Sequence, residues 1–388
     1  MDEPTPESNL LSPLKVGPLI APNRVFHAPC TRHRADVDQV PTEVMATYYR
    51  QRAGAGLIVS EGVNPSPMGR GYYNVPALYT EAHERGWARV ADAVHEADGR
   101  IFAQIMHVGR ISFPELLPGA ATPIGPSAVR PDPDFRGYAI RCPRHGRAFP
   151  TPKALDTDGI AREIGFFTQA AVRAVRAGLD GIEIHAASGY LPMQFLSSNT
   201  NQRTDAYGGT PEKRTRFLLE CLERAADAIG AERVAVKLAP TFCFNDVRDE
   251  DSRYLYSYLA GRLSVLGLAF VEVADFGESH SEPRRYDPIA LVREHYTGTL
   301  VANGGFTRDR AERLLSCGGA DAVSFGASYL ANPDLPERFR IGAGLNRPER
   351  ATFYETPDGD FSVGYTDYPT LATDPALAGR SGLIGADR

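Results

Sequence analysis

Cysteine is scarce in this sequence and never occurs as a closely spaced pair. The chain of 388 residues has five cysteines, scattered singly and without a CxxC motif. A zinc knuckle needs such pairs and a disulfide framework usually needs an even number, so neither is indicated. Cys30 has no evident basic partner, which favours a buried structural thiol over a catalytic one. We therefore expect a protein of a reducing compartment.

Long apolar runs and a strong excess of one charge are also missing. No apolar run approaches the roughly 18 residues that span a bilayer, and the opening MDEPTPESNLLSP is acidic where a signal peptide is basic. The formal net charge is only −6 and both signs are interspersed, so neither a nucleic acid nor a membrane is an expected partner. We expect a soluble, cytoplasmic protein that is a monomer or a homodimer.

The motifs of several common enzyme classes are absent. The sequence contains no P-loop, no GxSxG elbow, no HExxH and no GxGxxG that opens a helix. These absences argue against a nucleoside-triphosphate site, an α/β-hydrolase, a zinc protease and a Rossmann coenzyme site. No metal site is expected.

One pattern does repeat along the chain, in which a short apolar run is followed by a polar turn and a stretch with helical spacing. The predicted strands are residues 24–29, 57–62, 101–106, 181–186, 233–240, 269–275, 299–304 and 320–326. The clearest predicted helices are residues 80–97, 157–178, 211–229, 254–266 and 308–316. Alternation of this kind indicates parallel strands joined by helical crossovers. Eight such units favour an α/β fold of the closed (β/α)8, or TIM, barrel type over an open sheet.

The barrel is expected to form a single domain over residues 1–370. Residues 107–155 interrupt the pattern after the third strand with a Pro-, Gly- and Arg-rich stretch that is too long for an ordinary loop. This insertion is either a surface flap or an active-site lid. Residues 371–388 are rich in Ala, Gly and Asp, and are predicted to be a weakly ordered tail.

Function in such barrels collects at the C-terminal ends of the strands. The most informative of these ends begins the segment EIHAASGYLPMQFLSSNTNQRTDAYGG, which places His185, Ser188 and Tyr190 at one mouth. A single histidine at a strand end is often structural. Here a hydroxyl, a phenol and an ordered polar run follow it, which favours a functional site.

That segment resembles the signature of the old yellow enzyme family. NRVFHAPCTR, GYYNVPALYTEA, IFAQIMHVGR, FGASYLANPDLPERF and GYTDYP resemble further family segments in the same order. The resemblance runs from about residue 11 to residue 370, nearly the whole chain. It implies a bound FMN, reduction by NAD(P)H, and hydride delivery to the β-carbon of a small enone-like substrate. In this family the coenzyme reaches the flavin through the substrate's site, so no Rossmann motif is needed.

Positions carry over from the family motifs residue by residue. Gln104 would hydrogen-bond the flavin pyrimidine edge, and Lys237 would place a positive charge near N1 and C2=O, where reduction leaves negative charge. Backbone amides would hold the phosphate. The implied cofactor positions are Pro29, Cys30, Thr31, Gly62, Gln104, Lys237, Gly304, Gly305, Gly326 and Ala327.

The resemblance also implies how the substrate is activated. His185 and Ser188 would hold the substrate carbonyl oxygen, and Tyr190 would give a proton to the α-carbon as general acid. Met106 replaces a bulky aromatic residue and would widen the substrate pocket. Tyr365 is placed at the pocket rim, with core packing as the alternative.

Two positions depart from the family pattern. Ser188 stands where the family has Asn or His, and Ala327 stands where an arginine clamps the FMN phosphate. Loss of that clamp should weaken phosphate binding by roughly 1.5–3 kcal/mol, with Arg308 as a candidate to compensate. The departures favour an ene-reductase with a specialised biosynthetic or xenobiotic role. Two alternatives stay open: a barrel with weak or lost flavin that acts as a non-redox acid/base isomerase or cyclase, and a catalytically silent scaffold.

Overall fold

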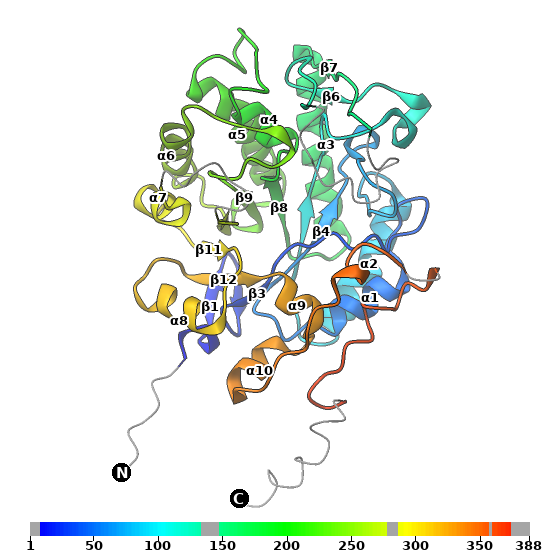
Figure 1. The fold of residues 1–388 in the computed structure, drawn as a ribbon, viewed down its shortest axis with the longest axis vertical. Helices are drawn as coiled ribbons and strands as arrows, with labels where there is room; N and C mark the ends of the chain where they lie inside the picture. The colour runs from blue at the N-terminus through cyan, green and yellow to red at the C-terminus, as the bar shows by residue number, and fades with distance from the viewer. Residues whose placement is uncertain (1–7, 133–146, 278–285, 357–358, 374–388) are drawn as a thin grey trace, which may run out of the picture.

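A closed barrel of parallel strands forms the centre of the molecule (Figure 1). The structure is a computed structural model that describes residues 8–132, 147–277, 286–356 and 359–373. In the order in which they pair, the barrel strands are β3 (Val25–His27), β4 (Ile58–Val63), β5 (Ile101–Ile105), β8 (Gly181–Ala186), β9 (Val234–Leu238), β10 (Phe270–Ala274), β11 (Leu300–Asn303) and β12 (Ala322–Phe325). Strand β12 pairs in parallel with β3 and closes the ring. The predicted (β/α)8 barrel is confirmed, and each strand lies within a residue of its predicted range or inside it.

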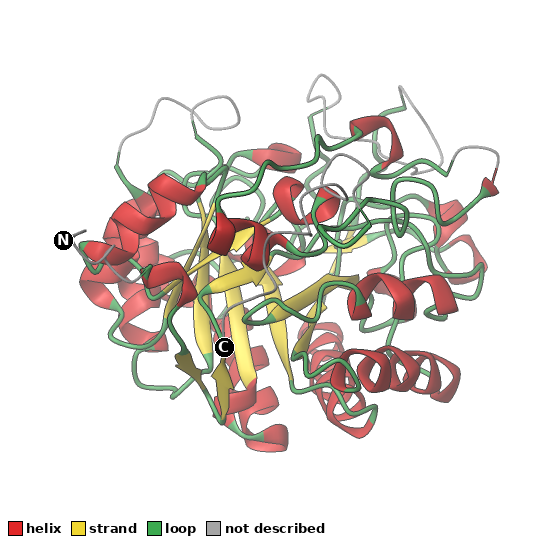
Figure 2. Ribbon diagram, turned by 90° about the horizontal axis from the view of Figure 1, so that it is seen from below, coloured by secondary structure: helices red, strands yellow, loops and turns green. Residues whose placement is uncertain are grey.

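Helices surround the barrel, as the red ribbons around the yellow strands in Figure 2 show. They are α1 (Glu43–Arg50), α2 (Glu81–His95), α3 (Thr157–Arg176), α4 (Leu191–Leu196), α5 (Pro211–Ile229), α6 (Ser252–Leu263), α7 (Pro288–His295), α8 (Arg308–Ser316), α9 (Ala327–Ala331) and α10 (Leu335–Ile341). The five predicted helices are present, and α5 and α8 have the predicted bounds. Within the described ranges, no helix combines the length and apolar character needed to cross a bilayer.

Helix α3 illustrates why these segments are helical. The side chain of Asp156 caps its first turn by accepting a hydrogen bond from the Gly159 N–H at 2.7 Å. Ile160, Ile164 and Phe167 follow at helical spacing and are buried, so one face packs on the barrel and against α5. The helix therefore holds the position of the next strand, β8, which carries His185 and leads into Ser188 and Tyr190.

An antiparallel hairpin of β1 (Leu14–Val16) and β2 (Leu19–Ala21) closes the N-terminal end of the barrel. Its buried residues pack with Phe26, Phe102 and Phe270 from the barrel strands in one apolar cluster. This hairpin was not predicted from the sequence, because each strand has only three residues, too few to show a period. The short helices α1, α4, α7, α9 and α10 were not predicted either, because none exceeds eight residues and the period of a helix is read over longer windows.

The insertion after β5 is attached to the barrel mouth at its base. Two short parallel strands, β6 (Ile124–Gly125) and β7 (Lys153–Ala154), pair with each other, and Arg203 donates hydrogen bonds to the carbonyls of Pro126 and Leu155. Phe149 packs on the apolar cluster that contains Met106 and Tyr190. Residues 133–146 of the insertion and residues 374–388 of the predicted tail lie outside the described residues, so the predicted flap and weakly ordered tail remain predictions.

Candidate active site

A cavity of about 500 Å³ lies at the C-terminal end of the barrel, within the range of about 300–1,000 Å³ that is typical of cofactor and ligand sites. The structure brings together most of the predicted residues around it. Those that line the cavity are Pro29, Cys30, Thr31, Gln104, Met106, His185, Ser188, Tyr190, Lys237, Gly304, Gly305, Gly326 and Ala327. They come from strand ends that are far apart in the sequence but adjacent in the barrel.

Glycines at the ends of two neighbouring barrel strands leave the cavity wall without side chains. Gly304 has φ +129°, and a Cβ there would lie 1.8 Å from the carbonyl oxygen of Asp275. Gly305 has φ +58° and open space where its Cβ would be, a conformation that favours glycine. Gly326 follows the neighbouring strand, β12, and directly precedes α9. These loops leave room for a phosphate near exposed backbone, so the glycines fit the FMN phosphate site that the sequence implies.

Lys237 presents a buried positive charge to the cavity. Its Nζ lies 2.6 Å from Glu272 Oε1 on β10 and 3.4 Å from Asn303 Oδ1 on β11. Burial lowers the pKa of Lys237, but the negative charge of Glu272 and its hydrogen bond to the lysine act in the opposite direction, and the pKa is raised overall. The lysine therefore stays protonated, as the predicted flavin contact requires.

Gln104 is fixed by a second buried carboxyl group. Its Nε2 donates to Glu183 Oε2 at 2.7 Å, which leaves the amide oxygen of Gln104 as the acceptor on the cavity side. Burial, followed by the charge of Glu272, raises the pKa of Glu183 well above its ordinary value. Burial and the neighbouring carboxylate therefore favour the protonated form of Glu183.

His185 is a neutral imidazole at the mouth of β8. Burial and, next, the charge of Lys237 lower its pKa to about 3. Its Nδ1 is buried and has no hydrogen-bond partner among the described residues. A buried polar atom usually has a partner, so this orphaned nitrogen fits a site that a ligand oxygen completes.

Tyr190 lies beside His185, with ring centroids 5.1 Å apart and ring planes at 80°. Its hydroxyl shares a hydrogen bond of 2.9 Å with the hydroxyl of Tyr72. Burial raises the pKa of Tyr190 to about 12, although the bond to Tyr72 acts in the opposite direction. The phenol is therefore protonated at neutral pH and can act as an acid.

Ser188 occupies a tight turn that the next loop holds in place. It has φ +55°, and its carbonyl accepts a hydrogen bond of 2.8 Å from Asn245 Nδ2. A Cβ on the following Gly189 would lie 2.4 Å from the carbonyl oxygen of Phe244. The serine lines the cavity, and its short side chain leaves more room near His185 than an asparagine would.

Three residues lie elsewhere than the sequence analysis placed them. Tyr365 is fully buried and stacks on Tyr48 with centroids 4.0 Å apart, so the structure favours core packing over the predicted place in the substrate pocket. Gly62 does not line the cavity, whereas Met106 does. A Cβ at position 62 would lie 2.5 Å from Met106 Sδ, so the methionine covers this glycine. Arg308 begins α8 and does not line the cavity, so its role as a substitute for the clamp missing at Ala327 stays a prediction.

Several lining residues were not predicted. Tyr72 belongs to the segment GYYN, which carried the family resemblance, but nothing in the sequence singled out this tyrosine. The others come from loops after the strands or, for Phe353 and Tyr354, from the segment after α10, where spacing gives no signal. These lining residues are His33, Phe242, Phe244, Phe276, Phe353 and Tyr354.

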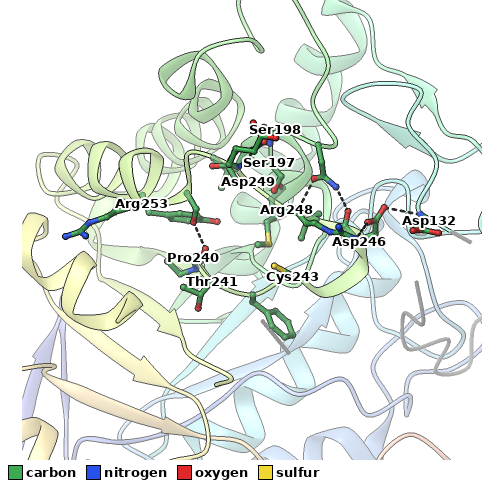
Figure 3. A pocket seen from close by; sticks show the side chains of 18 of the residues that line it. Asp132, Ser197, Ser198, Pro240, Thr241, Cys243, Asp246, Arg248, Asp249 and Arg253 are labelled. Carbon is green, nitrogen blue, oxygen red and sulfur yellow. Dashed lines mark hydrogen bonds and ion pairs between the residues drawn. The ribbon is translucent and has the colours of Figure 1, made fainter. Parts of the chain in front are cut away.

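A second cavity, of about 1000 Å³, lies next to the first, and Phe242 lines both. Several of its polar groups are already bound within the protein (Figure 3): Asp246 accepts a hydrogen bond of 3.0 Å from the Asp132 N–H and pairs with Arg248 at 3.5 Å. Asp249 pairs at 2.7 Å with Arg214, which is not a lining residue. These bonds hold the loops around the mouth together. We therefore assign the chemistry to the smaller cavity.

Comparison with known proteins agrees with this site. The family profile described as NADH:flavin oxidoreductase / NADH oxidase family matches residues 9–346. A probable flavin mononucleotide-dependent alkene reductase of Leishmania infantum is 40% identical over 93% of this chain and 97% of its own length. 12-Oxophytodienoate reductase 1 of Oryza sativa subsp. japonica is 39% identical, over 93% of each chain.

Solved structures give the same result. Morphinone reductase superposes with a TM-score of 0.87 at 42% identity, over 94% of this chain and 97% of its own. The old yellow enzyme homologue from Zymomonas mobilis has a TM-score of 0.87 at 36% identity, over 93% and 99%. The chain therefore belongs to the old yellow enzyme family and is an FMN-dependent, NAD(P)H-driven oxidoreductase of the ene-reductase type.

Proposed function

We propose that this enzyme reduces the activated C=C bond of an enone- or enal-like molecule. The carrying observation is a neutral imidazole with an unpartnered nitrogen and a protonated phenol, which face the same cavity as Lys237 and Gln104. FMN, when bound, supplies the hydride chemistry between NAD(P)H and the alkene. Two of the relatives, an alkene reductase and a 12-oxophytodienoate reductase, support the same substrate class.

His185 would hold the carbonyl oxygen of the substrate. Because its pKa is lowered to about 3, the imidazole donates a neutral hydrogen bond over the whole physiological pH range. Ser188 would add a second, shorter donor. Polarisation of the carbonyl draws electrons from the β-carbon and stabilises the enolate that hydride addition creates.

Tyr190 would then transfer its proton to the α-carbon. The raised pKa of about 12 keeps the phenol protonated, and the hydrogen bond of 2.9 Å to Tyr72 gives a path by which a proton can be replaced. General acid catalysis of this kind contributes about 10²–10⁴-fold.

The cavity walls favour a broad, largely apolar substrate. Phe242 stacks on Phe244 and contacts Phe276 in one part of the wall, Tyr354 also lines the cavity, and aromatic walls suit flat rings. Together with Met106, they support a bulky cyclic enone and a specialised biosynthetic or xenobiotic role.

The test combines a spectrum with turnover. FMN-loaded protein should bleach when NAD(P)H is added anaerobically, and a cyclic enone should restore the absorbance and yield the saturated ketone by mass spectrometry. His185→Ala should bleach normally but bind the enone more weakly. If no enone or enal reoxidises the protein, the proposed substrate class is wrong. If the protein is colourless and refractory to FMN, the isomerase, cyclase or scaffold alternatives gain support.

A further inference from the structure

Two carboxyl groups lie directly behind the side chains that face the cavity. Glu183, Lys237 and Glu272 stand on the adjacent strands β8, β9 and β10, and Lys237 is the register partner of Glu272. Both glutamates are fully buried, whereas Lys237 and Gln104 line the cavity. Gln104 is thus backed by the buried carboxyl group of Glu183, and Lys237 by that of Glu272.

The hydrogen bonds of this layer indicate how its charge is distributed. Glu272 Oε1 is bound by Lys237 Nζ at 2.6 Å and by Ser324 Oγ at 3.1 Å, which favours an ionised carboxylate. Glu183 Oε1 and Glu272 Oε2 are both buried without a donor among the described residues. One proton held on Glu183 and shared with Glu272 would satisfy both oxygens.

This assignment makes the layer neutral overall. Lys237 carries one positive charge, Glu272 one negative charge, and Glu183 none. When FMN is reduced, two electrons and one proton enter the oxidised cofactor, so it gains one negative charge. A lysine that is already paired stabilises that new charge less than an unpaired lysine would.

We propose that Glu272 is a positioning residue that lowers the reduction potential of bound FMN by offsetting the charge of Lys237, while Glu183 contributes no charge. The inference rests on the bound FMN and holds for any alkene substrate. A buried glutamate would then set the balance between the two half-reactions, because a lower potential of FMN slows its reduction by NAD(P)H and favours hydride transfer to the alkene.

The test measures the two-electron potential of the FMN-loaded protein by equilibration with a reference dye. Glu272→Gln should bind reduced FMN at least tenfold more tightly, relative to oxidised FMN, than the wild type does, which corresponds to a rise of about 30 mV. Glu272→Asp keeps the charge and should stay near the wild-type potential. Glu183→Gln is the matched control, because an amide closely replaces a protonated carboxyl, and its potential should not move.

Two results would overturn the inference. One is a potential that stays constant or falls in Glu272→Gln, and the other is a rise in Glu183→Gln as large as that in Glu272→Gln. A measurement on the unmodified holoenzyme covers the case in which Glu272→Gln does not retain FMN. The infrared difference spectrum between the oxidised and reduced forms of the wild-type holoenzyme should contain a protonated-carboxyl band, and Glu183→Gln should remove that band. Absence of the band from the wild-type spectrum would refute the shared proton.

Discussion

Tyr190 and Tyr72 allow the acid role to be separated from the structural one. The two hydroxyls form one buried hydrogen bond of 2.9 Å, so Tyr190→Phe and Tyr72→Phe each remove one end of the same bond. A typical buried hydrogen bond contributes about 0.5–1.5 kcal/mol. Both variants should therefore lose similar amounts of stability, which thermal or urea unfolding can compare.

The kinetic effects should differ between the two variants. Tyr190→Phe removes the proposed acid and should slow reoxidation by an enone by about 10²–10⁴-fold. Tyr72→Phe keeps the acid and should slow the same step much less. Reduction by NAD(P)H needs no proton from either residue, so its rate should be similar in both variants and in the wild type.

Stopped-flow absorbance of bound FMN, under anaerobic conditions, measures each half-reaction separately. The reasoning fails if Tyr72→Phe slows reoxidation as much as Tyr190→Phe does, or if Tyr190→Phe retains nearly the wild-type rate. A solvent isotope effect that is present in the wild type and absent in Tyr190→Phe would give independent support.

Three further predictions follow from the site. Ala327→Arg should tighten FMN binding by about one to two decades, since it supplies a charge-assisted contact of roughly 1.5–3 kcal/mol; fluorescence titration measures this, and unchanged affinity would contradict it. Because the pKa of His185 is lowered to about 3 and that of Tyr190 is raised to about 12, His185 is neutral above the first value and Tyr190 is protonated below the second. Enone-dependent reoxidation should then be flat between pH 5 and pH 9, and a step near the ordinary histidine pKa of about 6.5 would refute this. Gly304→Ala places a Cβ 1.8 Å from a backbone oxygen and should abolish stable FMN binding in the same titration. Gly305→Ala meets open space and should lower the free energy of unfolding by only about 1–2 kcal/mol through left-handed strain, which chemical unfolding of the two variants can compare.

Much of this architecture could be predicted because the barrel repeats one local pattern. The strands around Gln104, His185 and Lys237 are apolar runs with a polar residue at or near the C-terminal end, and parallel closure brings such ends together. The loops carry no such period, so Phe242 and Tyr354 could not be placed. Glu272 shows a different limit, since a carboxylate inside a strand becomes interpretable only when its partner across the sheet is known.

The hairpin of β1 and β2 has a consequence for the order of events in turnover. With Phe26, Phe102 and Phe270 packed against it, no ligand can reach the cavity through the N-terminal end of the barrel. The nicotinamide coenzyme and the alkene must then enter and leave through the C-terminal end, and each must dissociate before the other binds. Steady-state plots at several fixed coenzyme concentrations should accordingly give parallel lines, and excess of either reactant should inhibit the other competitively.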